Sequence, residues 1–319
     1  MARQTPRPAF PDAPMSRAAA TSERRSLAAS LLISLRPSQW TKNLFVFAGL
    51  LFSLKLFEPG AIVTSLEAFA IFCALSGIVY LLNDVLDRDS DRRHPTKSSR
   101  PIAAGDLPVP AALVAGALIG AIALTLAFAL SWQFGIVATA YVGLQALYSL
   151  SLKHIVILDV LTIAIGFVLR AVAGAVVLDV MISHWLLVCM ILLALFIAMA
   201  KRRHELVLLA DDASSHRPIL GEYSAYLLDQ MIAVVTASTL IAYIFYTISP
   251  ETEQKFGTTW LGLTIPFPLY GIFRYLYLVH KRELGGSPAD LLLNDRPLLA
   301  CVTFWVLAVV LIIYHPFVP

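Results

Sequence analysis

Long apolar runs follow one another along almost the whole sequence, and they restrict the fold more than any other feature. Each run has about 17 to 23 residues, which as an α-helix is enough to cross a hydrocarbon core of about 30 Å. Within lipid, a helix satisfies its own backbone hydrogen bonds, whereas an isolated strand does not. The runs cover residues 40–57, 61–82, 108–130, 133–151, 155–177, 183–200, 231–249, 258–279 and 298–314. The sequence therefore predicts an all-α integral membrane protein with nine transmembrane helices.

The composition agrees with this fold class. Hydrophobic residues make up 58% of the chain and charged residues only 14%, which excludes an ordinary soluble enzyme. Residues 1–30 are rich in Arg, Pro, Ala and Ser and lack the apolar core of a signal peptide, so we expect a disordered cytoplasmic tail. No later polar segment is long enough for a separate soluble domain. Residues 31–319 are therefore expected to form a single transmembrane domain.

Basic residues gather on one side of the predicted helices. With nine spans, the tail and alternate loops hold 20 of the 24 Lys and Arg, while the opposite loops hold only Lys55 and Lys255. Cytoplasmic loops collect Lys and Arg, so we expect a multi-pass plasma-membrane protein with a cytoplasmic N-terminus. The small net charge of +3 does not indicate a nucleic-acid partner. Gly116 and Gly120 suit close helix packing within one subunit or between copies, so the sequence allows a homo-oligomer.

A polar segment with three regularly spaced carboxylates directly follows the second run. If that helix continues, Asp84, Asp87 and Asp91 lie within about 60° of one helical face. Three converging carboxylates repel one another unless a cation neutralises them, and oxygen ligands suit Mg²⁺ that carries substrate phosphates. The pattern therefore predicts a metal site made by these three residues. Asp84 and Asp87 are the first catalytic candidates.

Groups suited to binding phosphate surround this segment. Asp89 projects about 140° from Asp84, so we expect it to face solvent or pair with Arg92 or Arg93, outside the metal site. Arg offers phosphate a planar pair of donors. The candidate substrate-binding residues here are Asn83, Arg88, Arg92, Lys97 and Arg100. The alternative is an ordinary solvated loop, because acidic and basic residues are balanced across it.

A second set of candidates lies around the fourth and fifth runs. Tyr148 and Lys153 end the fourth run, where Lys153 either contacts phosphate or only extends its charge to the membrane surface. Arg170 lies about four turns into the fifth run, where a charge is costly without a partner and is by default a functional candidate. Its alternative role is a buried structural pair with Asp159 or Asp179.

A third set follows the sixth run. Lys201, Arg202 and Glu205 continue the apolar helix at the depth predicted for the Asp-rich segment, so we interpret them as ligands for phosphate, metal or sugar hydroxyls. Lys201 and Glu205 are also one turn apart and suit a surface pair. Asp295 is expected to cap the last helix. The three cysteines, Cys73, Cys189 and Cys301, have no metal-binding spacing and are interpreted as small core residues.

The segment Asn83-Asp84-x-x-Asp87-x-x-x-Asp91 resembles the first Asp-rich motif of the UbiA superfamily of intramembrane prenyltransferases. This resemblance implies a bundle of nine helices with a lateral opening to lipid. Residues 36–43, 91–105 and 158–171 resemble the decaprenyl-phosphate phosphoribosyltransferase branch, and the first of these stretches adds Lys42 as a substrate-binding residue. The aromatic prenyltransferases carry a second Asp-rich motif after the sixth helix, where this chain has Lys201-Arg-Arg-His-Glu205.

The resemblance implies Mg²⁺-dependent transfer of 5-phosphoribose from phosphoribosyl diphosphate to a polyprenyl phosphate such as decaprenyl phosphate, for cell-wall arabinan precursors. The expected catalytic residues are then Asp84, Asp87, Lys153 and Arg170. One alternative is an aromatic prenyltransferase that uses a polyprenyl diphosphate. Another is a membrane transporter gated by Arg170 and the acidic cluster, although transporters usually place their sites at the midplane between repeats.

Overall fold

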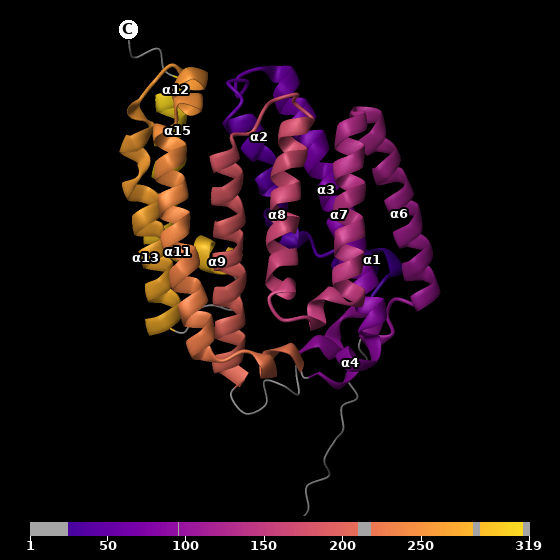
Figure 1. Ribbon diagram of the computed structural model, residues 1–319. Coiled ribbons are helices and arrows are strands. Elements are labelled where there is room, and N and C mark those ends of the chain that lie inside the picture. The colour runs from indigo at the N-terminus through magenta and orange to yellow at the C-terminus, as the bar shows by residue number, and fades with distance from the viewer. Residues whose placement is uncertain (1–24, 95, 210–217, 283–287, 315–319) are drawn as a thin grey trace, which may run out of the picture.

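The computed structural model describes residues 25–94, 96–209, 218–282 and 288–314, and these form a helical bundle (Figure 1). The long helices are α3 (Pro59–Leu86), α6 (Val109–Leu130), α7 (Trp132–Leu150), α8 (Leu158–Val176), α9 (His184–Leu209), α11 (Ala225–Ile248), α13 (Pro266–Lys281) and α15 (Arg296–Tyr314). They run side by side, and no strand occurs in the described ranges. The predicted all-α class is confirmed.

Within the described ranges, six helices are long and apolar enough to cross a membrane. They are α3, α6, α8, α9, α11 and α15. The other three predicted runs do not form long apolar helices of this kind. The run at 133–151 is α7, which carries two glutamines and two tyrosines, and the run at 258–279 is split between η6 (Trp260–Thr264) and the 16-residue α13. Residues 40–57 are not a continuous α-helix.

That first run instead begins as a 3₁₀-helix, η1 (Pro37–Phe47), and continues as one turn of α-helix, α2 (Ala48–Leu51). A 3₁₀-helix has three residues per turn, so side chains at i and i+3 share a row. One row of η1 is exposed and contains Ser38, Thr41 and Leu44, whereas Asn43 and Val46 belong to the row that faces inward. The period of three places the polar Asn43 in the interior of the bundle.

Glycines allow η1 and α2 to approach α8 at backbone distance. A Cβ built on Gly174 would lie 1.8 Å from the carbonyl oxygen of Val46, and one on Gly49 would lie 2.4 Å from the backbone of Gly174. Such distances are impossible for any residue with a side chain unless the helices separate. The small residues therefore decide how closely η1 packs on α8.

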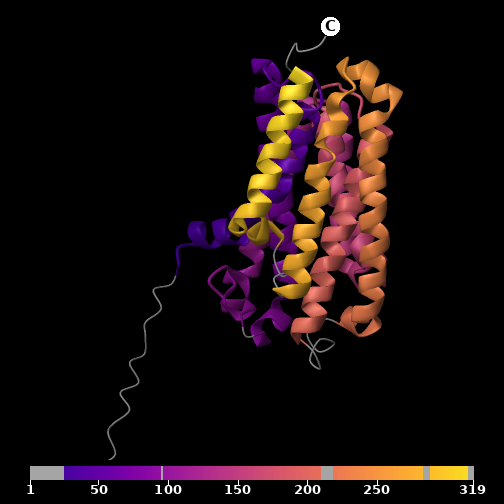
Figure 2. The same cartoon turned by 90° about the vertical axis from the view of Figure 1, so that its left-hand side faces the viewer.

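Shorter elements complete the chain. They are α1 (Leu27–Ser34), α4 (Arg88–Arg93), η2 (Lys97–Ser99), α5 (Pro101–Ala104), η3 (Leu152–His154), η5 (Pro218–Glu222), α12 (Pro250–Phe256) and α14 (Pro288–Asn294). Helix α1 projects sideways from the bundle in Figure 2. It begins inside the predicted tail, because the side chain of Ser26 accepts a hydrogen bond from the backbone of Ala29 and caps the helix. Residues 1–24 lie outside the described ranges.

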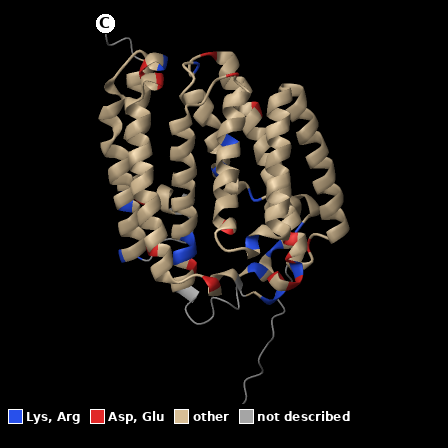
Figure 3. Cartoon of the chain, in the orientation of Figure 1, with Lys and Arg blue, Asp and Glu red and all other residues tan. Residues whose placement is uncertain are grey.

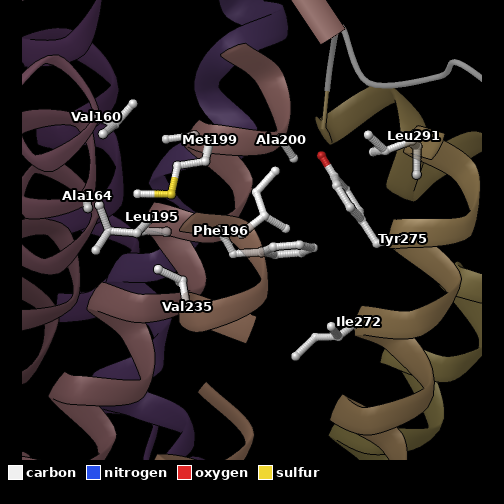
Figure 4. Packing of buried hydrophobic residues seen from close by; sticks show 14 of the residues in the cluster. Val160, Ala164, Leu195, Phe196, Met199, Ala200, Val235, Ile272, Tyr275 and Leu291 are labelled. Carbon is white, nitrogen blue, oxygen red and sulfur yellow. The ribbon is translucent and has the colours of Figure 1, made fainter. Parts of the chain in front are cut away.

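The main hydrophobic core lies among α8, α9, α11 and α13 (Figure 4). In it the rings of Phe196 and Tyr275 pack edge to face with centroids 5.1 Å apart, next to Ile272. This packing joins the helices of the second half of the chain. The buried cysteines have free thiols, which confirms their role as core residues.

Charged residues concentrate at one end of the bundle (Figure 3). This charged end comprises α4, η2, η3 and the segment Lys201–Glu205 of α9. A smaller charged group lies around α12 at the opposite end. The fold therefore brings the Asp-rich segment and the predicted basic segments to the same end.

Candidate functional site

The Asp-rich segment leaves α3 with a bend instead of continuing as one helix. Asp87 is the C-cap of α3, and α4 starts at the next residue. The helical path is nearly preserved, since Asp87 donates its N–H to Asn83 and Asp91 donates to Asp87, both at 2.8 Å. Asp87 is also the N-cap of α4, although its side chain makes no capping hydrogen bond. The predicted continuous helix is therefore wrong at Asp87.

Two of the three predicted carboxylates converge on one cation. Asp84 and Asp91 are buried, and both accept hydrogen bonds from Nη1 of Arg100, at 3.1 and 2.6 Å. Asp84 also accepts a hydrogen bond from Arg36. Asp87 is directed elsewhere and pairs with Nζ of Lys153 at 3.1 Å. Asp84 and Asp91 thus share a cationic partner, whereas Asp87 has a different one.

The arrangement of these three carboxylates shows whether a divalent cation could bind between them. Among the described residues, no group of three or more His, Cys, Asp or Glu is arranged to hold a metal ion. However, the guanidinium nitrogen of Arg100 lies between the oxygens of Asp84 and Asp91, where it stands in for a shared cation. Two carboxylates that meet at one positive charge fit Mg²⁺ chemistry. A third ligand from Asp87 requires its release from Lys153.

The side chain of Tyr80 contacts two cationic side chains near the buried carboxylates. The guanidinium of Arg36 lies 4.7 Å from the ring centroid of Tyr80, and Nζ of Lys42 lies 3.4 Å from the Tyr80 hydroxyl. Arg36 has a positive φ of 51°, which turns the chain between α1 and η1. The roles of Arg36 and Tyr80 were missed from the sequence. Tyr80 lies one helical turn before Asp84, and this spacing was the available signal.

The remaining basic residues of the segment lie around α4 and η2. Nε of Arg92 donates to the carbonyl of Ala103 at 3.1 Å, so part of this side chain holds the loop together. Nε of Arg88 is buried without a hydrogen-bond partner in the part of the chain that the structure describes. Lys97 lies in η2. Asp89 is exposed and lies 3.9 Å from Arg92, which confirms the prediction that it faces solvent or pairs with Arg92.

Arg170 lies inside the bundle among neutral partners. It is only 6% exposed, and it donates to Oδ1 of Asn43 at 2.8 Å and to the Tyr141 hydroxyl at 2.7 Å. Its guanidinium also lies 4.7 Å from the centroid of the Tyr141 ring and 5.2 Å from that of Phe167. Among the described residues it forms no ion pair within 4 Å, so the alternative role as a buried pair with Asp159 or Asp179 is wrong. Packing on an electron-rich ring replaces the carboxylate.

Asn43 links η1 to two helices, to α8 through Arg170 and to α3 through Ser76. Besides accepting from Arg170, its amide donates to Ser76 at 3.0 Å. Asn43 therefore connects α3, η1 and α8. The sequence reading did not assign it a role, because the 3₁₀ geometry that turns it inward was not expected.

Asp159 pairs with Arg202 instead of Arg170. Arg202 is 2% exposed, and it donates to Asp159 at 2.9 Å, to Glu205 at 2.8 Å and to the Tyr148 hydroxyl at 3.4 Å. Asp159 also accepts from the Tyr223 hydroxyl at 2.8 Å. Arg202 therefore forms the centre of a buried ion-pair network, whereas the sequence predicted that it binds phosphate. Buried charges need such partners.

Other predictions at the charged end have clear outcomes. Lys201 lies 3.8 Å from Glu205, which confirms the alternative of a surface pair. Oδ1 of Asp295 accepts the N–H of Leu298 at 2.9 Å, which confirms Asp295 as the cap of α15. Arg274 pairs with Asp295 at 2.8 Å and, through this hydrogen bond, lowers the pKa of the carboxyl.

A cavity of about 490 Å³ lies at the opposite end of the bundle, lined by residues that include Asp179, Ser183, Tyr246 and Lys255. None of the predicted site residues lines it. We assign the candidate site to the charged end because the carboxylates, the basic residues and the polar contacts meet there.

Comparison with known proteins agrees with this arrangement. Residues 43–294 match the UbiA prenyltransferase family. The chain is 31% identical to the decaprenyl-phosphate phosphoribosyltransferases of Mycolicibacterium smegmatis, over 88% of this chain and 92% of that one, and of Mycobacterium tuberculosis, over 92% and 98%.

The fold is also similar to solved structures. A UbiA homologue from Archaeoglobus fulgidus, solved with GPP and Mg²⁺ bound, aligns with a TM-score of 0.70 over 89% of this chain and 99% of that one, at 18% identity. At this identity the likeness concerns the fold alone. With the family match covering most of the sequence, the chain belongs to the UbiA prenyltransferase family.

Proposed function

We propose that this protein transfers 5-phosphoribose from phosphoribosyl diphosphate to a polyprenyl phosphate, with decaprenyl phosphate as the first candidate. The names of the 31% identical relatives support this activity. The observation that carries it is the convergence of Asp84 and Asp91 on one cationic nitrogen, beside further cations, at one end of a membrane bundle. The product would serve as a cell-wall arabinan precursor.

The metal role is assigned to Asp84 and Asp91, with Asp87 joining after it leaves Lys153. A Mg²⁺ ion held there would neutralise the diphosphate as negative charge develops on it. Arg100 would then move from the carboxylates to phosphate oxygens, which its planar fork suits. Mg²⁺ bound to the Archaeoglobus homologue supports a divalent metal in this fold.

The remaining residues position the two substrates. In the reaction an oxygen of the acceptor phosphate bonds to C1 of the ribose while the bond from C1 to the diphosphate breaks. The acceptor oxygen is already anionic near neutral pH, so placement contributes more than a general base. We assign phosphate contacts to Lys42, Arg88, Arg92, Lys97, Lys153 and Lys201. Asn83, Tyr148 and Glu205 are assigned to sugar or phosphate hydrogen bonds.

Arg170 and Arg202 have different parts in this proposal. Arg170 keeps its positive charge without a carboxylate partner among the described residues, so its field favours an anion in the bundle. Arg202 fixes the position of Glu205 and Tyr148.

For the topology, we propose that η1 with α2, α7, and η6 with α13 cross the membrane in addition to the six long apolar helices, which gives nine crossings. The N-terminus and the charged end would then face the cytoplasm, at the plasma membrane, with residues 1–30 as a tail and residues 31–319 as one catalytic domain. The excess of Lys and Arg at the charged end supports this orientation. It also gives a soluble phosphorylated donor direct access to the site.

Transfer of label from phosphoribosyl diphosphate to decaprenyl phosphate by purified protein in detergent tests the donor and the metal together. We expect label in the lipid phase only with Mg²⁺. Asp84→Asn should lower kcat/KM by at least about 100-fold, because a shared ligand of the cation loses its charge. A folded Asp84→Asn protein with full activity would refute the metal role.

The second candidate is an aromatic prenyltransferase, which is favoured by the GPP bound in the structural neighbour. Against it stands the basic sequence at Lys201–Glu205, where a second Asp-rich motif is expected. Prenylation of 4-hydroxybenzoate from a polyprenyl diphosphate, without labelling from phosphoribosyl diphosphate, would select this candidate. A transporter fits less well, because the acidic and basic groups gather at one end.

A further inference from the structure

The hydroxyl of Tyr223 connects the segment after η5 to the start of α8. It accepts the N–H of Ile157 at 2.8 Å and donates to Oδ1 of Asp159 at 2.8 Å. The side chain is buried, and its ring belongs to a small apolar cluster with Ile219 and Leu228, against which Val156 packs. Tyr223 therefore contacts the turn before α8 through its hydroxyl, and the apolar cluster that contains its ring packs against Val156 of the same turn.

That turn contains a strained residue. Ile157 has φ 69° and ψ −42°, a region that β-branched residues rarely adopt, and it directly precedes α8. Such a conformation persists only when surrounding contacts enforce it. The hydrogen bond from its N–H to Tyr223 is such a contact.

The strained turn lies four residues after Lys153. Lys153 belongs to η3, and its Nζ is 3.1 Å from Asp87. A change in the path of the chain at Ile157 therefore shifts η3 relative to the Asp-rich segment. Elements η3 and η5 also contact each other, so the segment that leads into Tyr223 lies beside this turn.

Tyr223 retains the proton it needs for this contact. Burial, together with the hydrogen bond to Asp159, raises its pKa to about 12. At neutral pH the hydroxyl is therefore a donor to the buried carboxylate and an acceptor for Ile157. Asp159 in turn holds Arg202, so the start of α8 is tied to α9 as well.

We propose that Tyr223 is a positioning residue, which holds the strained turn at Ile157 and thereby places the Lys153 ammonium against the substrate phosphates at the Asp-rich segment. This inference rests on the proposed function, since it takes Lys153 as a phosphate-contacting residue. It assigns residues 218–223 a part in catalysis without direct contact with substrate.

A double-mutant cycle tests the inference. We expect Tyr223→Phe, which keeps the ring but removes the hydroxyl, to lower kcat/KM for phosphoribosyl diphosphate by about 10-fold, and Lys153→Gln by about 100-fold. If Tyr223 acts through Lys153, the double variant is no worse than Lys153→Gln alone. If the loss in Tyr223→Phe is purely structural, the fold-reductions in kcat/KM of the two single variants multiply in the double variant.

A rescue variant and a matched control sharpen the cycle. Glycine adopts positive φ without steric cost, so Ile157→Gly should recover most of the activity that Tyr223→Phe loses. Tyr243→Phe is the control, because its buried hydroxyl also has two partners, Thr264 and Trp305, but lies in α11 away from the charged end. It should leave kcat/KM unchanged.

The outcomes separate the two levels of the proposal. A wild-type protein without phosphoribosyl transfer overturns the proposed function. A wild-type protein with transfer, in which the losses from Tyr223→Phe and Lys153→Gln multiply and Ile157→Gly gives no rescue, overturns the positioning role. Size-exclusion profiles and thermal unfolding of each variant in detergent show that the compared proteins are folded.

Discussion

Two arginines in the interior of the bundle are stabilised in opposite ways. Arg202, at the charged end, is surrounded by Asp159, Glu205 and Tyr148, so its charge is cancelled locally. Arg170 lies deeper along α8 and is held by an amide, a phenol hydroxyl, a backbone carbonyl and an aromatic face. Both arrangements satisfy the donors of the guanidinium, but only the second leaves a net positive charge in an apolar surrounding.

This difference separates structural from functional charge. A neutralised arginine contributes little field beyond its own network, whereas a positive charge with neutral partners attracts an anion from a distance. The comparison therefore assigns Arg202 to the framework of the site and Arg170 to its electrostatics. It also predicts different responses when the partners of each arginine are removed.

The largest effect is expected from breaking the Arg202 network. Asp159→Leu should lower the free energy of unfolding by about 3 to 5 kcal/mol, because Arg202 remains buried with one carboxylate fewer. The measurement is chemical unfolding of the purified protein in detergent. Adding Arg202→Met should restore part of the loss, and a double variant that is less stable than Asp159→Leu would contradict the network as described.

The next prediction concerns the close packing of η1 on α8, which places Asn43 beside Arg170. Gly174→Ala should destabilise the protein by about 1 to 3 kcal/mol, because the new methyl group collides with the backbone of Val46. Gly143→Ala is the matched control, since a Cβ at that position meets no atom within 4 Å. Equal unfolding midpoints for the two variants would show that η1 does not pack on α8 at backbone distance.

A smaller effect is expected from the neutral partners of Arg170. Tyr141→Phe removes one hydrogen bond but keeps the ring beneath the guanidinium, so the cost should be about 1 kcal/mol. Tyr141→Leu also removes the aromatic face and should cost more. If both variants unfold at the same denaturant concentration, the ring does not stabilise the cation.

The smallest effect concerns a third arginine, which is paired at the edge of the bundle. Arg274 lowers the pKa of Asp295, so this pair stabilises the folded protein above the unfolded-state pKa of Asp. The contribution is lost as the pH falls through the lower folded pKa. Asp295→Asn should therefore show a weaker loss of stability below about pH 4 than the wild type. An unchanged pH profile would show that this half-buried pair contributes nothing measurable.

The local parts of the site were predictable from the sequence. The end of the second apolar run and the spacing of Asp84, Asp87 and Asp91 placed a carboxylate segment at the end of a long helix, and α3 ends there. The cap at Asp295 and the core positions of the cysteines were also correctly predicted. These features depend on residues within about one or two helical turns of one another.

The partners of the charges were not predictable in the same way. Asp159 was one of two partners considered in the alternative role of Arg170, but it pairs with Arg202 of α9. Asp87 was expected beside Asp84, but it pairs with Lys153, 66 residues later. Helical spacing shows which residues share a face, but it does not show which neighbouring helix covers that face.

By itself, the sequence determined that this protein is an all-α membrane bundle with an Asp-rich segment at the end of a helix, because run length and periodicity act locally. Only the tertiary structure decided that the first run is a 3₁₀-helix against α8, that two carboxylates rather than three meet at one cation, and that Tyr223 holds the turn before α8. These outcomes depend on backbone approach at glycines and on contacts between distant helices. Such contacts form only when the helices pack.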